Sequence, residues 1–425
     1  MDRSHSAQRI VWTLTICTAL ALLGDSTFYA VLPSQYGAVG ITALQVGWLL
    51  SANRLVRPPL NMLSGWLNQQ VGHRSPYIVG LAVGAVSTLG YGLVRGFWPL
   101  LALRVMWGVA WALLAVSAQG LVLDVSTHET RGRLAGIYSP FSYFGGALGA
   151  MAGGFLTDSL GISPAMLILG GFSVLGVLGA LTLPRQERRP SGPMDRTNEM
   201  GTSPEERRAI FSGRLRLPTR MDGRLWLILA LNFGHRFFFA GVFYSTIGLY
   251  LAQTLGDEVQ LGALVVGVAS LTATLLFARN VVSVLVGPAL GYLSDLLGDR
   301  TRVLLLGEAL GVAGLACFAS SDSLWLILPG VALAASAYGI VPPMLVSWMG
   351  DLTRPGERGV MVGSFQTTGD IGSGVGPLAA YALVAVAGIR PTYAVAALAL
   401  SLTIPLILYV RTRSAHTGQT MPRAR

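Results

Sequence analysis

The chain has 425 residues, of which 52% are hydrophobic and 12% are charged, and its mean hydropathy is +0.58. Soluble domains carry about twice that share of charged residues, so the composition excludes an ordinary soluble protein and predicts one that crosses a membrane many times. All 30 basic residues are arginine, and the net charge is +10. Because lysine is absent, a Walker phosphate-binding loop, a Schiff-base enzyme and a lysine nucleophile are excluded.

Several segments are long and apolar enough to cross a hydrocarbon core about 30 Å thick, which takes about 20 residues of helix. They are residues 10–32, 44–67, 76–96, 98–123, 134–157, 163–184, 225–252, 261–290, 302–320, 323–350, 359–388 and 391–410, twelve in all. They lack the alternation of membrane β-strands, so we expect an all-α integral membrane protein. The first segment follows two arginines as a signal peptide does, but it is long enough to span, and we expect it to be retained.

The placement of arginine predicts the orientation of these segments. With the N-terminus in the cytoplasm, 23 arginines fall on the cytoplasmic side, and only Arg95 and Arg390 fall in outer loops. This bias predicts that both termini lie on the inner face of the cell (inner) membrane, and it requires an even number of spans. The same distribution accounts for the positive net charge without a nucleic-acid partner.

One long polar stretch separates six spans from six. We therefore divide the chain into an N-terminal bundle (1–184), a cytoplasmic linker (185–224) and a C-terminal bundle with a cytoplasmic tail (225–425). Within the linker, Ser-Pro-Glu-Glu-Arg-Arg at 203–208 is typical of a helix start. We expect a tether with a short helix on the membrane surface rather than a regulatory domain.

The two halves repeat each other at a shift of 226 or 227 residues. Gly-Trp-Leu-Asn-Gln-Gln-Val-Gly at 65–72 matches Gly-Tyr-Leu-Ser-Asp-Leu-Leu-Gly at 291–298. Thr-Arg-Gly-Arg-Leu-Ala-Gly at 130–136 matches Glu-Arg-Gly-Val-Met-Val-Gly at 357–363. Two halves of like construction, with sites between them, are the architecture of secondary transporters. We therefore expect two pseudo-symmetric six-helix bundles.

The first of these repeats resembles a signature of the major facilitator superfamily, Gly-x-Leu-Ala-Asp-Arg-x-Gly-Arg-Lys, and the resemblance extends over nearly the whole chain. The second half keeps the aspartate as Asp295, whereas the first half has Gln69 in its place. The resemblance implies a cytoplasmic gate in which Asp295 pairs with Arg358 or Arg354. The gate residues that it implies are Gly65, Gly72, Arg74, Gly291, Asp295, Gly298 and Arg358.

Two further motifs resemble those of proton-coupled members of that family. Arg104-x-x-x-Gly108 is similar to a motif linked to proton coupling. The glycines from Gly145 to Gly154 are similar to the exporter motif Gly-x-x-x-Gly-Pro-x-x-Gly-Gly, with Ala150 in place of the proline. The resemblance implies proton coupling and points toward export. Glycines four residues apart also let two helices approach closely, so tight packing alone is the alternative.

Two arginines lie deep inside the second span. Arg54 and Arg57 are about 16 and 12 Å from its cytoplasmic end at a rise of 1.5 Å per residue. A charge near mid-membrane costs about 2.5–3.5 kcal/mol on insertion scales, which favours a water-filled cavity over lipid. Asn53, Arg57 and Asn61 recur every four residues and therefore share one face of a helix. The Pro-Pro pair after Arg57 is expected to bend or loosen this helix.

More polar and charged residues fall at mid-membrane in the helices that line the central path of the family. Guanidinium groups suit carboxylate and phosphate oxygens. The expected substrate-binding residues are Asn53, Arg54, Arg57, His235, Arg236, Arg279 and Asn280. These cations outnumber the mid-membrane acids, which predicts attraction for an anion. The alternatives are that single arginines bond to backbone carbonyls or to the acids, and that His235 packs in the core.

Acids at mid-membrane are candidates for proton coupling. Burial favours the protonated form of a carboxyl group, and a nearby guanidinium favours the ionised form. A carboxyl group whose arginine neighbour moves can therefore take up and release a proton. We expect Asp25 with Arg104 as the coupling pair and Asp370 as a second candidate. A static ion pair that holds helices together is the alternative.

Together these features predict a monomeric secondary transporter that moves a small organic solute by alternating access, coupled to protons. The substrate is either an organic anion or metal chelate, or else a drug or hydrophobic metabolite that is exported, and the direction stays open. Five scattered histidines and two separated cysteines, Cys17 and Cys317, argue against an enzyme, a metal site, a disulfide or a cofactor. A non-transporting sensor is a remote alternative.

Overall fold

A computed structural model describes residues 2–127, 130–184, 223–261, 264–297, 300–320, 323–353 and 358–416. The first half contains α1 (Asp2–Gln35), the 3-10 helix η1 (Tyr36–Val39), α2 (Ala43–Leu55), α3 (Arg57–Val71), α4 (Arg74–Leu93), α5 (Phe97–Val125), α6 (Arg131–Leu160) and α7 (Ile162–Leu181). The second half contains α9 (Gly223–His235), η3 (Arg236–Phe243), α10 (Tyr244–Leu255), β1 (Glu258–Leu261), β2 (Leu264–Gly267), α11 (Val268–Leu297), α12 (Arg300–Ser320), α13 (Leu324–Leu352), α14 (Arg358–Ala387), α15 (Ile389–Ser401) and α16 (Thr403–His416). The linker proposed at 185–224, with the helix start at 203–208, lies outside the described residues except for its last two positions, 223 and 224.

The helices confirm an all-α membrane protein with twelve spans. Ten helical segments of the described chain are long and apolar enough to cross a membrane by themselves. The second and fifth spans complete the set. The second is divided into α2 and α3, and the fifth is α6, which carries more polar residues along its 30 positions.

The second span breaks at Val56, next to the buried arginines. Helix α2 ends at Leu55, and α3 begins at Arg57 with Pro58 and Pro59 in its first turn. Proline has no N–H and its ring clashes with the preceding turn, so it suits the start of a helix and weakens the turn before it. Membrane helices can still contain proline, as α13 does at Pro342 and Pro343. The Pro-Pro pair favours this break, which places Arg54 and Arg57 on either side of a joint.

The seventh span also departs from a regular α-helix. Helices α9 and α10 are joined by η3, a π-helix that runs from Arg236 to Phe243. A π-helix carries an extra residue within each hydrogen-bonded turn and is frequently found at functional sites. The charged residue at its start, Arg236, faces the cavity described below.

The eighth span begins later than the sequence predicted. Residues 261–267 were expected in that helix, but β1 and β2 form an antiparallel hairpin in which Glu258 is paired with Gly267. Helix α11 starts only at Val268. Apolar residues such as Val265 and Val266 suit a strand as well as a helix, and hydropathy alone does not separate the two.

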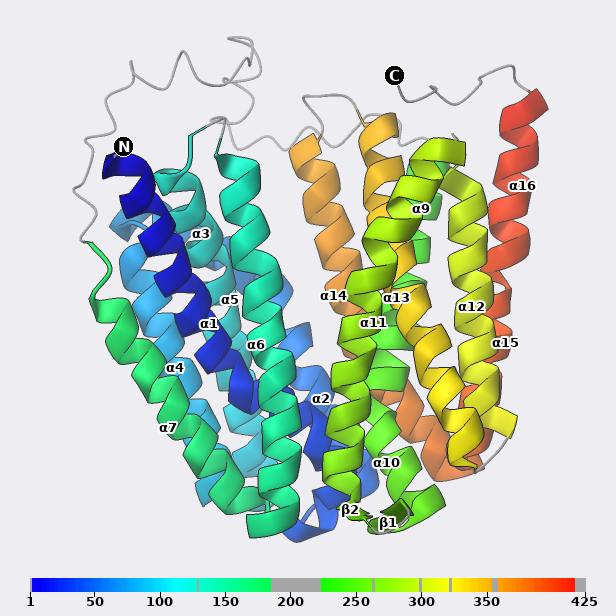
Figure 1. The fold of residues 1–425 in the computed structure, drawn as a ribbon, viewed down its shortest axis with the longest axis horizontal. Coiled ribbons are helices and arrows are strands. Elements are labelled where there is room, and N and C mark those ends of the chain that lie inside the picture. Colours follow the sequence, from blue (N-terminus) through cyan, green and yellow to red (C-terminus); the bar gives the residue numbers. More distant parts are fainter. Residues whose placement is uncertain are drawn as a thin grey trace.

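The two bundles are joined at one end and separate at the other (Figure 1). The largest buried apolar cluster draws on both halves, for example on Val46 and Leu249, near the end that holds the β-hairpin. Two other clusters each stay within one half: one includes Tyr77, and the other includes Trp348. The halves are therefore sealed together at the hairpin end and independent toward the end that carries the termini.

Candidate functional site: a charged cavity between the bundles

A cavity of about 470 Å³ lies between the two halves. Within the described chain, its wall comes from ten helices of both bundles: α1, α2, α3, α5, α6, η3, α10, α11, α13 and α14. The charged residues that line it are Asp25, Arg54, Arg57, Arg236, Arg279 and Asp370. A space of this size suits one small organic solute. Because the shared apolar core seals the hairpin end, the cavity faces the end with the termini.

One wall of the cavity holds an ion pair. Asp25 on α1 accepts a hydrogen bond from Nη1 of Arg104 on α5 at 2.5 Å, and the Asn53 amide lies 3.4 Å from the same oxygen. The hydroxyl of Tyr29 donates to Oδ1 of Asn53 at 2.9 Å. Arg104 and Asn53 are completely buried, whereas Asp25 lines the cavity. The carboxylate therefore has a buried cation on one side and the cavity on the other.

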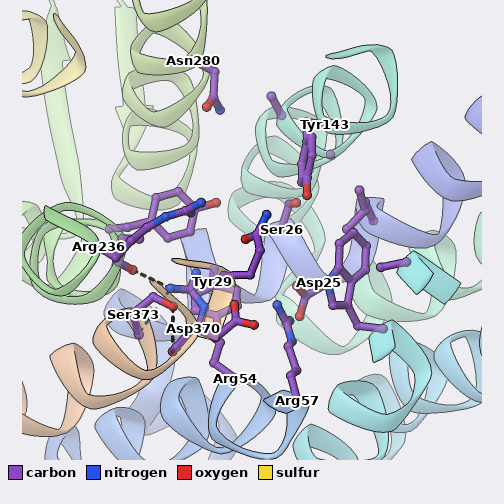
Figure 2. A pocket seen from close by; sticks show the side chains of 18 of the residues that line it. Asp25, Ser26, Tyr29, Arg54, Arg57, Tyr143, Arg236, Asn280, Asp370 and Ser373 are labelled. Carbon is purple, nitrogen blue, oxygen red and sulfur yellow. Dashed lines mark hydrogen bonds between the residues drawn. The ribbon is translucent and has the colours of Figure 1, made fainter. Parts of the chain in front are cut away.

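Arg54 connects the two halves. Its Nη1 donates to the backbone carbonyl of Ala240 at 2.8 Å and to that of Ser373 at 3.3 Å, on η3 and α14. Its guanidinium also lies over the ring of Tyr29, 4.8 Å from the centroid. Arg54 lines the cavity and is at the same time anchored to the opposite bundle by main-chain atoms (Figure 2).

Arg57 belongs to the first half alone. Its guanidinium lies over the ring of Trp111 on α5, at 5.5 Å from the centroid, and both residues line the cavity. The Nε atom of Arg57 is buried and has no hydrogen-bond partner within the described residues. A buried donor without a partner costs about 1–3 kcal/mol, and more when it is charged, so this group is available for an acceptor.

Two further arginines gather around Tyr338 on α13. The guanidinium of Arg279 lies 3.9 Å from the centroid of the Tyr338 ring and 5.5 Å from that of Tyr244. Nη1 of Arg236 is 3.5 Å from the Tyr338 hydroxyl. In the described chain, Nε of both arginines and Nη2 of Arg279 are buried without a hydrogen-bond partner. The second half thus holds its own pair of cations with unused donors.

The remaining predicted residues fall in different places. Asn280 and Asp370 line the cavity, and Ser373 donates from Oγ to the backbone carbonyl of Asp370 at 3.1 Å. His235 does not line it. Its side chain is 1% exposed and packs with ring centroids 4.7 Å from Phe239. One residue along a helix turns a side chain by about 100°, which separates His235 from its neighbour in the cavity.

The predicted gate residues that the structure describes lie toward the end that holds the N-terminus of α1. Arg74 donates from Nε to the carbonyl of Leu183 at 2.8 Å, so it caps the end of the sixth span in its own half. Gly72 ends α3 with φ of 78°, a conformation that favours glycine, and Gly65 lies on α3 with open space around it. Gly298 and Arg354 are outside the described residues. Of Gly291, Asp295 and Arg358, only the positions on α11 and α14 are described.

Two ion pairs at that same end were not expected. Arg300 donates from Nε to Asp351 at 2.9 Å, which links the start of α12 to the end of α13. In the first half, Nδ1 of His73 lies 2.7 Å from Asp124, which links the start of α4 to the end of α5. Each pair stays within one bundle, so neither joins the two halves.

Sequence reasoning missed most of the uncharged lining residues. These are Ser26, Tyr29, Trp111, Gln119, Tyr143, Tyr244, Tyr338, Gln366 and Ser373. One signal was available: Trp111, Ala115 and Gln119 recur every four residues on an otherwise apolar helix, and all three line the cavity. A tyrosine in a membrane helix does not indicate a cavity, because tyrosine also packs in the apolar core.

Comparison with known proteins places the fold in a family. A family model described as Major Facilitator Superfamily matches residues 14–286 and 273–424. The puromycin resistance protein pur8 of Streptomyces alboniger is 31% identical over 182 residues, which cover 42% of this chain and 36% of that protein. The uncharacterized MFS-type transporter MJ1560 of Methanocaldococcus jannaschii is 22% identical over 404 residues, covering 95% of this chain and 98% of the relative.

Solved structures agree on the fold. The crystal structure of the nucleoside transporter NupG superposes with a TM-score of 0.72 at 13% identity, covering 94% of this chain and 98% of that one. The alignments to the first curated relatives span only 31–39% of the length of those proteins. The helical architecture, the repeat and the match of the family model along nearly the whole chain show that this protein belongs to the Major Facilitator Superfamily.

Proposed function

We propose that the protein is a proton-coupled secondary transporter of organic anions in the cytoplasmic membrane. The observation that carries the proposal is the charge of the central cavity, where four guanidinium groups face two carboxylates. Asp25 is already paired with Arg104, so the cations that remain are in excess over Asp370. A cavity with net positive charge attracts and holds an anion, and arginine donors suit carboxylate oxygens in particular.

The orientation follows from the arginine bias of the loops, which favours a cytoplasmic location for both termini. In that orientation the cavity is open to the cytoplasm and the hairpin end faces outward. Alternating access then consists of opening the apolar seal at the hairpin end while the two bundles close around the cavity at the other end.

Asp25 and Arg104 supply the coupling in this proposal. The Asp25 carboxylate lies at the cavity wall, where protons and solute can reach it, and its partner is a completely buried guanidinium. Protonation of Asp25 removes the negative charge that holds Arg104 and leaves that cation without its ion pair. A buried cation without a partner is unfavourable, so the proton state of Asp25 biases the packing of α1 against α5. Asp370 on α14 is the second candidate for this role.

The test is transport in proteoliposomes with an imposed pH gradient. A panel of radiolabelled mono- and dicarboxylates is offered to the purified protein and to its Asp25→Asn variant. We expect the native protein to accumulate anions in response to the gradient. The variant should lose gradient-driven accumulation and keep exchange of labelled for unlabelled anion, because the binding arginines are intact.

The matched control is Asp257→Asn, at an exposed acid next to the hairpin, which should behave as the native protein. Accumulation by Asp25→Asn that still follows the pH gradient would refute the coupling role. If the native protein moves none of the anions, the substrate assignment itself is wrong.

Export of drugs or hydrophobic metabolites is a second candidate. It is favoured by the similarity to a puromycin resistance protein and by the five aromatic rings that line the cavity, Tyr29, Trp111, Tyr143, Tyr244 and Tyr338. The same proteoliposomes distinguish the two candidates when uncharged and cationic aromatic compounds are offered beside the anions. Export predicts transport of those compounds that survives neutralisation of Arg279.

A further inference from the structure

We infer that the cavity binds a dianion, with one anionic group held by each bundle. This inference rests on the proposed function and narrows its substrate class to solutes with two separated acidic groups. It follows from the placement of the arginines whose donors are unused, which form two subsites rather than one.

The subsite of the first half consists of Arg57 and Trp111. The guanidinium lies over the indole ring at 5.5 Å, which fixes its plane and leaves its N–H groups at the edge of the stack. Both residues come from the same bundle, on α3 and α5, so they keep this geometry when the bundles move relative to each other. The unpartnered Nε of Arg57 marks the group as one that awaits an acceptor.

The subsite of the second half consists of Arg236, Arg279 and Tyr338. Arg279 is 4% exposed and stacks on Tyr338 at 3.9 Å, and Arg236 reaches the hydroxyl of the same tyrosine. These residues come from η3, α11 and α13, all within the second bundle. Their three unpartnered donor atoms exceed those of the first subsite.

The two subsites are separate. Figure 2 shows Arg57 and Arg236 on opposite sides of the pocket, with Arg54 between them. Arg54 belongs to neither subsite, because its Nη1 donates across the bundles to the carbonyls of Ala240 and Ser373. A solute that bridges the subsites therefore needs an acidic group at each end. Its middle part must fit between the aromatic and amide side chains that line the cavity.

A dianion also explains why each bundle carries its own cations. When the cavity closes around a monoanion, the donors of one subsite stay buried and unsatisfied, which opposes closure. A dianion satisfies both subsites and thereby favours the state in which both bundles contact the solute. Recognition and closure are then the same event.

The experiment compares matched acids by isothermal titration of the purified full-length protein. The probes are benzene-1,4-dicarboxylate against benzoate, and the linear α,ω-dicarboxylates of four to eight carbons against the monocarboxylates of equal length. We expect the best dicarboxylate to bind at least about tenfold more tightly than its monocarboxylate, the effect of one additional charged hydrogen-bonded contact.

Variants then assign the two ends. Arg57→Gln and Arg279→Gln should each reduce dicarboxylate affinity to about that of the monocarboxylate, while monocarboxylate affinity changes little because the other subsite remains. Arg57→Lys keeps the charge and should retain part of the preference, which separates recognition from folding. Arg95→Gln, in an exposed loop, is the matched control.

Equal affinity for mono- and dicarboxylates throughout the panel would overturn the inference and leave anion transport standing. Loss of dicarboxylate binding in only one of the two glutamine variants would also overturn it, because it would mean a single subsite. Failure of every acid to bind, together with no anion transport in proteoliposomes, would remove the proposed function as well.

Discussion

Two of the contacts between the bundles at the hairpin end correspond to each other in the internal repeat, yet they are built differently. One joins α2 to α14, and there α2 begins with its own capping box, in which Thr42 and Gln45 exchange hydrogen bonds. The other joins α6 to α11, and there Asp158 of α6 accepts a hydrogen bond from the backbone N–H of Ser270 at 2.7 Å. The first helix start is satisfied locally, whereas the second depends on a carboxylate from the opposite bundle.

This difference shows that two interfaces of similar packing need not be equally easy to open. A carboxylate at a helix N-terminus is stabilised by unpaired N–H groups and by the helix dipole. Opening the α6–α11 contact must therefore break a polar interaction as well as apolar packing. Opening the α2–α14 contact separates glycine, proline and tyrosine surfaces near the start of α2 and, at the far end of α2, breaks the hydrogen bond from Arg54 to the carbonyl of Ser373.

The largest shift toward the state open at the hairpin end is expected from a larger side chain where α6 and α11 are in close contact. A Cβ atom at Gly154 would stand 2.6 Å from the carbonyl oxygen of Ala269, so Gly154→Leu forces the helices apart. Overpacking of this kind costs about 1–3 kcal/mol, which is about a 5- to 150-fold shift in population toward the state open at the hairpin end. Spin labels at Ser159 and Gln260 report the distance, after both native cysteines are replaced by alanine.

The counterpart in the other interface is Gly47→Leu. There the Cβ would stand 2.9 Å from the carbonyl oxygen of Pro377, which leaves slightly more room, and a smaller shift is expected. Unchanged label distances in both variants would mean that this end does not need to be closely packed to stay closed.

A smaller effect is expected from Asp158→Asn. The amide keeps a hydrogen-bond acceptor but loses the negative charge at the start of α11, and such capping contacts are typically worth about 0.5–2 kcal/mol. The same spin labels should show more of the open state. Thr42→Ala is the control, because it removes a cap of α2 that lies within one bundle. An equal shift in the control would show that the contact between the bundles has no special role.

The smallest effect is expected at the other end, from His73→Arg. The repeat relates the pair of His73 and Asp124 to the pair of Arg300 and Asp351, but histidine carries charge only when protonated. Arginine carries a permanent charge, so the variant places a fixed cation beside Asp124, as Arg300 does beside Asp351.

The check is thermal unfolding of the purified protein. At a fixed pH the variant should be more stable than the native protein by no more than about 1 kcal/mol, as for other exposed pairs. An unfolding temperature equal to that of the native protein would show that a permanent charge at this position adds no attraction to Asp124.

Much of the fold was predictable because it follows from solvation of the backbone and from hydropathy. The twelve spans are confirmed. The Pro-Pro pair predicted a bent or loosened helix next to Arg57, and the second span is broken there. The cost of burying charge in a membrane also placed Arg54, Arg57, Arg236 and Arg279 at a cavity, where the structure has them. These inferences depend on local sequence and on the large free-energy cost of placing a charge in hydrocarbon.

What could not be predicted depends on contacts between distant segments. Tyr338 becomes the centre of a subsite only because α13 packs beside η3 and α11, and nothing in its neighbours along the chain indicates this. The hairpin at 258–267 replaces the expected start of a helix, because a short apolar run suits either structure. The role of Asp158 requires knowing which helix starts beside it in the other half.

The bridge made by Arg54 has a consequence for inheritance. Its two acceptors are main-chain oxygens, at Ala240 and Ser373, and a main-chain oxygen is retained whatever side chain the codon specifies. A substitution at Ala240 or Ser373 that leaves the backbone in place therefore keeps the acceptors of these hydrogen bonds. The side chain that these hydrogen bonds require is encoded by one codon, that of Arg54.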